Sequence, residues 1–109
     1  MTGQMSDAAA EVALLNACLW SKNARIASRR HVFPSDFYEP RHEAIYEAML
    51  TLDRHGKTVD PVTVQAALAA AGNYDRSMHE VFPALMTAQG TTEQGAADYA
   101  TIVHGWALR

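Results

Sequence analysis

The side chains that could bind a metal or act as a nucleophile are too scattered along this sequence to form a recognisable site. Its five histidines never occur as HxxH, HxxxH or HExxH, and His42-Glu43 lacks a second ligand four residues on. These spacings are the usual signatures of zinc sites. The single cysteine, Cys18, lies on the apolar side of a predicted helix, where we interpret it as a small core residue rather than a nucleophile. We expect no metal site here.

Three glutamates recur every four residues, at Glu39, Glu43 and Glu47, a spacing that could pair carboxylates for acid–base catalysis. Nothing apolar surrounds these positions to raise a carboxyl pKa, so a solvated acidic ridge explains them better. The sequence also contains no GxxxxGK[ST] phosphate-binding loop, no GxGxxG and no GxSxG. We therefore predict a chain that is not an enzyme and holds no cofactor of its own.

Length and composition indicate one ordinary globular domain. A chain of 109 residues can build one modest core, and 49% hydrophobic with 19% charged residues disfavours global disorder. One cysteine excludes an internal disulfide, and no apolar run approaches the roughly 20 residues that span a bilayer. The first residues, MTGQMSDAAAE, lack the features of a signal peptide. The expected location is the cytoplasm.

Charge is unevenly distributed along the chain. The formal net charge of -3 argues against a grip on nucleic acid by the whole protein. However, no acid occurs between Val12 and Ser35, where Lys22, Arg25, Arg29 and Arg30 form a basic cluster. A solvated face is the favoured interpretation of this cluster, and a phosphate contact or a docking patch for an acidic partner stays open.

The hydrophobic periodicity predicts an all-α fold of about six helices. Ile45, Met49 and Leu52 share one face of a helix over about residues 40–55, which Gly56 ends. Asp60-Pro61 is a start signal for the next helix, which stops at Gly72. Further helices are expected over about residues 7–20, 23–30 and 92–107, the first capped by Asp7. No segment shows the alternation typical of a half-buried strand.

The last third is predicted to form a helical hairpin, which divides the chain into a globular head at residues 1–76 and a hairpin at 77–109. Ser77 and Glu80 match a capping box, whereas Pro83 predicts either a kink or a helix that begins at Phe82-Pro83. Residues 89–92 read as a turn, with Thr91 or Thr92 as the next cap. The hairpin carries more large apolar side chains than two helices need, so packing within the chain and an interface with another subunit both stay open. The candidate interface residues are Phe82, Leu85, Met86, Tyr99, Ile102, Val103 and Trp106.

The order of these motifs resembles the N-terminal domain of DnaB-type replicative DNA helicases over nearly the whole chain. The residues that carry the resemblance are Glu11 with Leu14, Leu15 and Leu19; Asp36-Phe37-Tyr38 with Pro40 and His42; Ile45-Tyr46-Glu47-Ala48-Met49 with Leu52; Gly56; Val59-Asp60-Pro61-Val62-Thr63-Val64; and Tyr99-Ala100-Thr101-Ile102-Val103. Two features depart from the family pattern: Asp75-Arg76-Ser77 stands where a Gly-Gly pair is usual, and Pro83 is uncommon. The family also continues past the position of Arg109 into a linker and a RecA-like ATPase.

The resemblance implies a non-catalytic collar domain that mediates subunit association and docks primase, with a helicase loader as a further possible partner. ATP and Mg would then belong to the motor domain of a parent helicase, and direct DNA binding by this domain would be weak or absent. An alternative is a stand-alone regulator that binds helicase or primase in trans. A small helix-turn-helix DNA-binding protein is disfavoured because the helix that begins at Pro61 offers only Gln65 to read bases.

Overall fold

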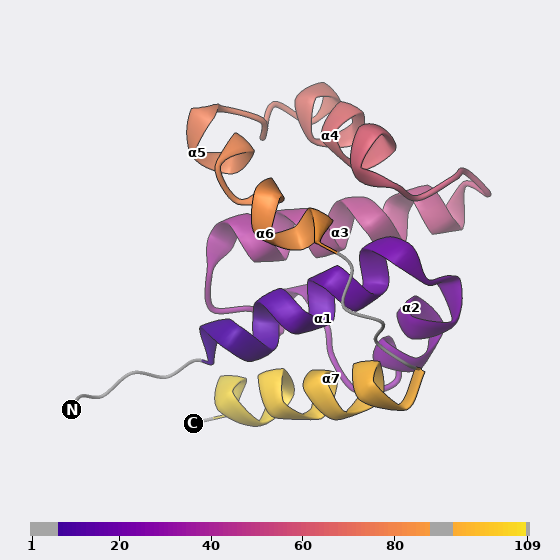
Figure 1. Ribbon diagram of the computed structural model, residues 1–109, viewed down its shortest axis with the longest axis vertical. Coiled ribbons are helices and arrows are strands. Elements are labelled where there is room, and N and C mark those ends of the chain that lie inside the picture. Colours follow the sequence, from indigo (N-terminus) through magenta and orange to yellow (C-terminus); the bar gives the residue numbers. More distant parts are fainter. Residues whose placement is uncertain (1–6, 88–92, 109) are drawn as a thin grey trace.

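The computed structural model describes residues 7–87 and 93–108, and these form seven α-helices and one 3-10 turn without a strand (Figure 1). The elements are α1 Ala8–Trp20, α2 Lys22–Ser28, η1 Pro34–Asp36, α3 Pro40–Arg54, α4 Pro61–Ala70, α5 Arg76–His79, α6 Phe82–Met86 and α7 Glu93–Ala107. The predicted all-α class is confirmed. None of the described helices is long and apolar enough to cross a bilayer.

The first two helices share one capping residue. Asp7 accepts a hydrogen bond from the Ala10 amide at 3.1 Å and so begins α1, as predicted. Ser21 ends α1 in an extended conformation, and its hydroxyl accepts from the Ala24 amide at 3.1 Å to begin α2. A side-chain oxygen at this position satisfies an amide that the first turn of a helix leaves unpaired. The chain therefore turns between α1 and α2 within one residue.

The start and stop signals around α3 and α4 act as the sequence predicts. Pro40 opens α3 at a position where its missing N–H costs nothing, and Gly56 follows with φ of 69°. Asp60 caps α4 through the Thr63 amide at 2.9 Å, and Thr63 accepts from the Asp60 amide in return. Gly72, with φ of 78°, lies beyond the end of α4. Both glycines adopt the left-handed conformation that other residues adopt only at a cost.

The predicted cap at Ser77 is wrong. Asp75 begins α5 instead, because its carboxylate accepts from the Met78 amide at 2.9 Å. Ser77 instead accepts a hydrogen bond from Arg41 at 3.1 Å. A separate helix, α6, begins at Phe82 with Pro83 in its first turn, which is the second of the two alternatives for Pro83. The predicted turn at residues 89–92 and the caps at Thr91 or Thr92 lie outside the described residues.

Helix α1 is the central element of the core. It contacts α2, α3, α6 and α7, and α4 packs on the far side of α3 (Figure 1). Leu14, Leu15 and Leu19 of α1 are fully buried, together with Ile45 and Met49 of α3. One apolar cluster extends from α1 to α7, because Ala96, Ala100 and Val103 belong to it. In this structure α6 and α7 thus share the core of the preceding helices, and the division at residue 76 stays a prediction.

Two buried polar contacts fasten α2 to its neighbours. Arg25, only 6% exposed, binds the Asp53 carboxylate through Nε at 2.7 Å and Nη2 at 3.0 Å. The Ser28 hydroxyl lies 2.8 Å from the Tyr46 hydroxyl and within 3.5 Å of the Cys18 thiol. Arg25 therefore does not belong to a solvated face, because its charge is used inside the fold. Lys22, Arg29 and Arg30 remain exposed.

Candidate protein–protein interface

The seven candidate interface residues fall into two groups. Phe82, Leu85 and Val103 lie in the core of the chain itself. The other four reach the surface: Met86 and Ile102 are 48% and 42% exposed, and Tyr99 and Trp106 are half-buried. An interface with another subunit would therefore use Met86, Tyr99, Ile102 and Trp106. The three core residues would not contact the other subunit, because they are buried within the chain.

Three of these surface residues share one flank of α7. Tyr99, Ile102 and Trp106 follow the i, i+3, i+7 spacing of a single helical stripe. The opposite flank of α7 faces α2 and η1, since Ala97 lines a cavity with Ala27 of α2 and His104 Nδ1 lies 2.8 Å from an Asp36 carboxylate oxygen. The stripe therefore faces away from α2 and η1.

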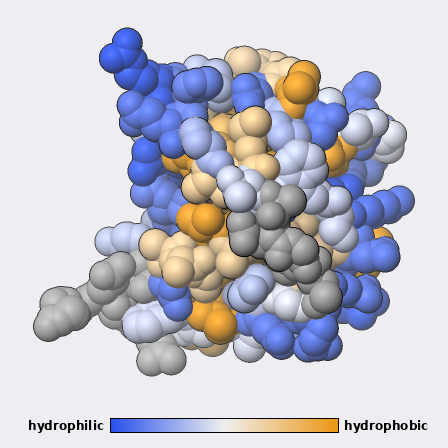
Figure 2. Space-filling model, viewed as in Figure 1, coloured by the Kyte–Doolittle hydropathy of each residue, from blue (hydrophilic) through white to orange (hydrophobic). Residues whose placement is uncertain are grey.

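A shallow apolar groove beside α1 is a second exposed apolar surface, and it was not predicted from the sequence. The groove has a volume of about 480 Å³ and lies between α1 and α6. Its lining residues are Ala8, Ala9, Val12, Ala13, Asn16 and Ala84. Figure 2 shows a continuous tan and orange area in this part of the molecule, where α1 and α6 face the viewer. The small side chains at helical spacing along α1 were a signal that could have revealed it.

Side-chain hydrogen bonds fix the rim of this groove. The Asn16 amide donates to the carbonyl oxygens of Leu85, at 2.8 Å, and Thr87. The Trp20 indole N–H donates to the same Leu85 carbonyl at 3.3 Å. These bonds satisfy carbonyl groups that the end of α6 leaves without helical partners. The exposed Met86 is thereby held at a fixed place beside α1.

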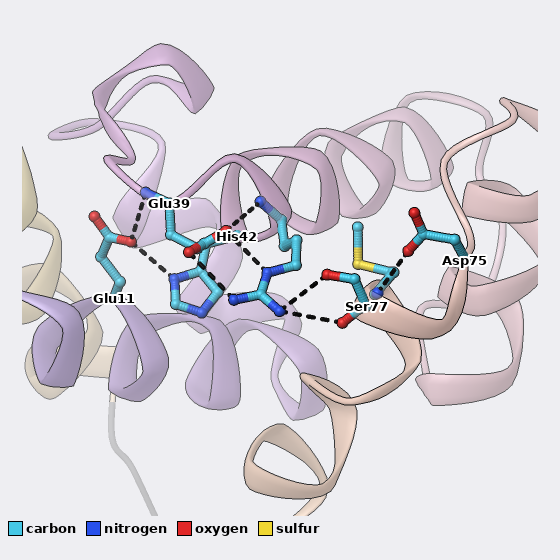
Figure 3. A network of polar contacts seen from close by, with 7 residues as sticks. Glu11, Glu39, His42, Asp75 and Ser77 are labelled. Carbon is cyan, nitrogen blue, oxygen red and sulfur yellow. Dashed lines mark hydrogen bonds and ion pairs between the residues drawn. The ribbon is translucent and has the colours of Figure 1, made fainter.

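A polar network at the other edge of α1 organises the start of α3 (Figure 3). The Glu11 carboxylate is 2% exposed and accepts from the Tyr38 amide at 2.7 Å and the Glu39 amide at 3.4 Å. The His42 ring nitrogen Nδ1 lies 2.8 Å from the same carboxylate. A buried carboxylate is tolerated only when such partners compensate for its lost hydration. Glu11 therefore joins α1 to the loop that precedes α3.

The network continues from α3 to α5. Arg41 binds the Glu39 carboxylate at 2.9 Å and donates to the Ser77 carbonyl at 3.2 Å. The hydrogen bond from the Arg41 side chain is the main reason that the pKa of Glu39 is lowered. Glu39 is thus a capping and ion-paired residue, whereas Glu47 is exposed and lines a pocket between α3 and α4. The contacts of Glu39 and Arg41 position α3 relative to α5.

The remaining reactive groups also serve the fold. Burial raises the pKa of the Cys18 thiol to about 12, which opposes formation of the thiolate that a nucleophile needs. Burial likewise raises the pKa of Tyr46. Within residues 7–87 and 93–108, no three histidine, cysteine, aspartate or glutamate side chains gather in a way that could hold a metal ion.

Comparisons of the sequence and of the fold with known proteins identify the same family. Residues 4–105 match the family model described as the DnaB-like helicase N-terminal domain. The chain is 35% identical over 102 residues to the replicative DNA helicase DnaB of Leifsonia xyli subsp. xyli, which covers 94% of this chain and 22% of that protein. The DnaB of Mycobacterium leprae is 34% identical, covering 94% of this chain and 17% of that protein.

The solved structures agree with this match. The crystal structure of the N-terminal domain of DnaB helicase from Mycobacterium tuberculosis superposes with a TM-score of 0.83 at 35% identity, covering 94% of this chain and 75% of that one. The chain therefore spans about a fifth of the length of the curated relatives and most of the solved domain. With a family model that matches nearly all of its residues, the chain belongs to the DnaB-like helicase N-terminal domain family.

Proposed function

We propose that this chain acts as the collar domain of a replicative DNA helicase, where it mediates subunit association and docks primase or a helicase loader. The observation that carries the proposal is the match of residues 4–105 to the family model, supported by the fold likeness to the solved DnaB domain. The ATP-driven motor, with its nucleotide and Mg, would lie in another part of the parent protein.

The exposed apolar surface supports the association role. We define the apolar face as Met86, Tyr99, Ile102 and Trp106 together with the α1 groove. A stable interface buries about 800 Å² on each partner, roughly an eighth of the 6062 Å² that this chain exposes. One short helix cannot supply that area, whereas the apolar face draws on α1, α6 and α7. None of the described residues that line it is charged, as is typical of an interface centre.

A pair of matched substitutions tests the association role. Ile102→Glu places a charge on the apolar face, and Val62→Glu places the same charge on an equally apolar but distant position, 76% exposed on α4. We expect sedimentation velocity to show weaker self-association for Ile102→Glu and unchanged association for Val62→Glu, because burying an unpaired carboxylate is costly. Equal sedimentation of both variants and the wild type would refute the assignment.

Primase docking is tested separately, by sedimentation of the wild-type chain with and without a purified bacterial primase. We expect a faster-sedimenting species that contains both proteins. If primase sediments unchanged at concentrations where the chain self-associates, the docking role is wrong and the association role stands alone.

A further inference from the structure

Basic side chains from two separate stretches of the sequence meet at one end of the molecule. The buried ion pair between Arg25 and Asp53 places α2 beside the last turn of α3. Figure 1 shows the end of α1, the whole of α2 and the end of α3 at the same side. We call this region the basic end, and its exposed cations are Lys22, Arg29, Arg30, Arg54 and Lys57. The cluster evident in the sequence supplies three of these five cations.

No ion pair between described residues neutralises the five cations of the basic end. Helix α2 contains no acid, and the one acid of residues 51–58, Asp53, is already paired with Arg25. None of the five exposed cations lies within ion-pair distance of a described acid, and Arg54 only donates to the Thr51 hydroxyl at 3.1 Å. The basic end is therefore a positively charged region on a chain whose formal net charge is -3.

Two exposed aromatic side chains lie within three residues of these cations in the sequence. Trp20, 49% exposed, precedes the residue that caps α2, and Phe33, 65% exposed, follows Arg30 by three residues. Val32, which immediately precedes Phe33, is buried, so it fixes the backbone from which the Phe33 ring extends. Basic side chains combined with exposed aromatic rings are how proteins bind single strands, because bases stack on the rings while cations contact phosphates.

We propose that the basic end binds single-stranded nucleic acid, with its cations on the phosphates and with Phe33 and Trp20 as stacking surfaces. An acidic protein segment would satisfy the cations but would give no role to two exposed rings beside them. One acid opposes the contact: Glu93 lines a cavity of about 400 Å³ between α2 and α7 together with Arg30 and His31. The contact is therefore weak and sensitive to salt, in keeping with a protein of net negative charge.

The test measures fluorescence anisotropy of a labelled oligothymidylate of about 20 nucleotides, longer than a typical single-strand site, titrated with the chain at several salt concentrations. Arg30→Gln/Lys57→Gln removes one cation from each stretch, and Arg76→Gln on α5 is the charge control.

Phe33→Leu removes the ring, and Tyr38→Leu is its control, since Tyr38 is also 65% exposed but precedes the opposite end of α3. Circular dichroism verifies each fold, with Arg29→Gln/Lys57→Gln as the replacement if the first double variant loses helicity.

We expect binding at about 50 mM salt that weakens with a log–log slope of about −0.7 for each phosphate contacted. The double variant should bind more weakly with a slope smaller by about 1.4, while Arg76→Gln keeps the wild-type slope. Phe33→Leu should weaken binding by about fivefold or more, and Tyr38→Leu should not. The proposal is overturned if the wild type fails to bind at the lowest salt, if the double variant keeps the slope, or if Phe33→Leu matches its control. Displacement of the oligonucleotide by equimolar polyglutamate would assign the basic end to an acidic protein instead.

Discussion

At the scale of single residues, the buried ion pair between Arg25 and Asp53 should matter most for stability. The two side chains are 7% and 11% exposed, and removing one partner leaves a buried charge without compensation. We expect Asp53→Ala to lower the free energy of unfolding by about 3–5 kcal/mol, measured by urea denaturation. Asp98→Ala removes a carboxylate that is exposed on α7 and should change stability far less. A similar effect for both variants would mean that the buried pair contributes little.

The ion pair between Glu39 and Arg41 predicts a pH dependence with a definite sign. The hydrogen bond from Arg41 lowers the pKa of Glu39 in the folded chain. Stability from this pair is therefore fully present above the carboxyl's unfolded pKa of about 4.3, and it is lost as the pH falls through the lowered folded value. The pair is about one-third exposed, so the effect is small. Glu39→Gln should lower the thermal midpoint slightly at pH 7 and not at pH 2, and a difference of the same size at both pH values would contradict this.

At the scale of elements, the start of α5 separates two competing capping residues. The structure has Asp75 as the cap, with its carboxylate on the Met78 amide, whereas the sequence pattern favours Ser77. We expect Asp75→Ala to cost about 1 kcal/mol of stability and Ser77→Ala distinctly less, because Ser77 only accepts an exposed hydrogen bond from Arg41. Chemical denaturation of the two variants in parallel is the measurement. A larger loss of stability for Ser77→Ala than for Asp75→Ala would show that Ser77 is the cap after all.

Local signals explain why the helices could be predicted from the sequence. Asp7, Asp60 and the two glycines at positions 56 and 72 act on neighbouring residues, so their effect can be recognised without the fold. Pro83 was ambiguous because a kink and a new helix satisfy the same constraint on the backbone. The cap at Asp75 was missed because two acceptors two residues apart, Asp75 and Ser77, each offered a plausible helix start.

At the scale of the whole molecule, contacts between distant residues could not be predicted. The Arg25–Asp53 pair joins residues 28 positions apart, and Asn16 reaches Leu85 over 69 positions. Because those contacts decide which surfaces adjoin, the sequence indicated the surplus of apolar residues near the C-terminus but not the groove between α1 and α6. It likewise indicated three of the five cations of the basic end. The family resemblance, in contrast, rested on the order of local motifs, and it is confirmed.

The most direct test of the central claim, that this domain associates through its apolar face, is sedimentation equilibrium of the wild-type chain and of Trp106→Ala over a range of concentrations. We predict that the mass of the wild type rises above the 11.9 kDa of one chain as the concentration increases. Trp106→Ala should shift that rise to higher concentration by more than it lowers helicity, because loss of the indole removes apolar contact area on α7. A wild-type mass that stays at 11.9 kDa throughout, or a Trp106→Ala curve that coincides with the wild type, would contradict the account.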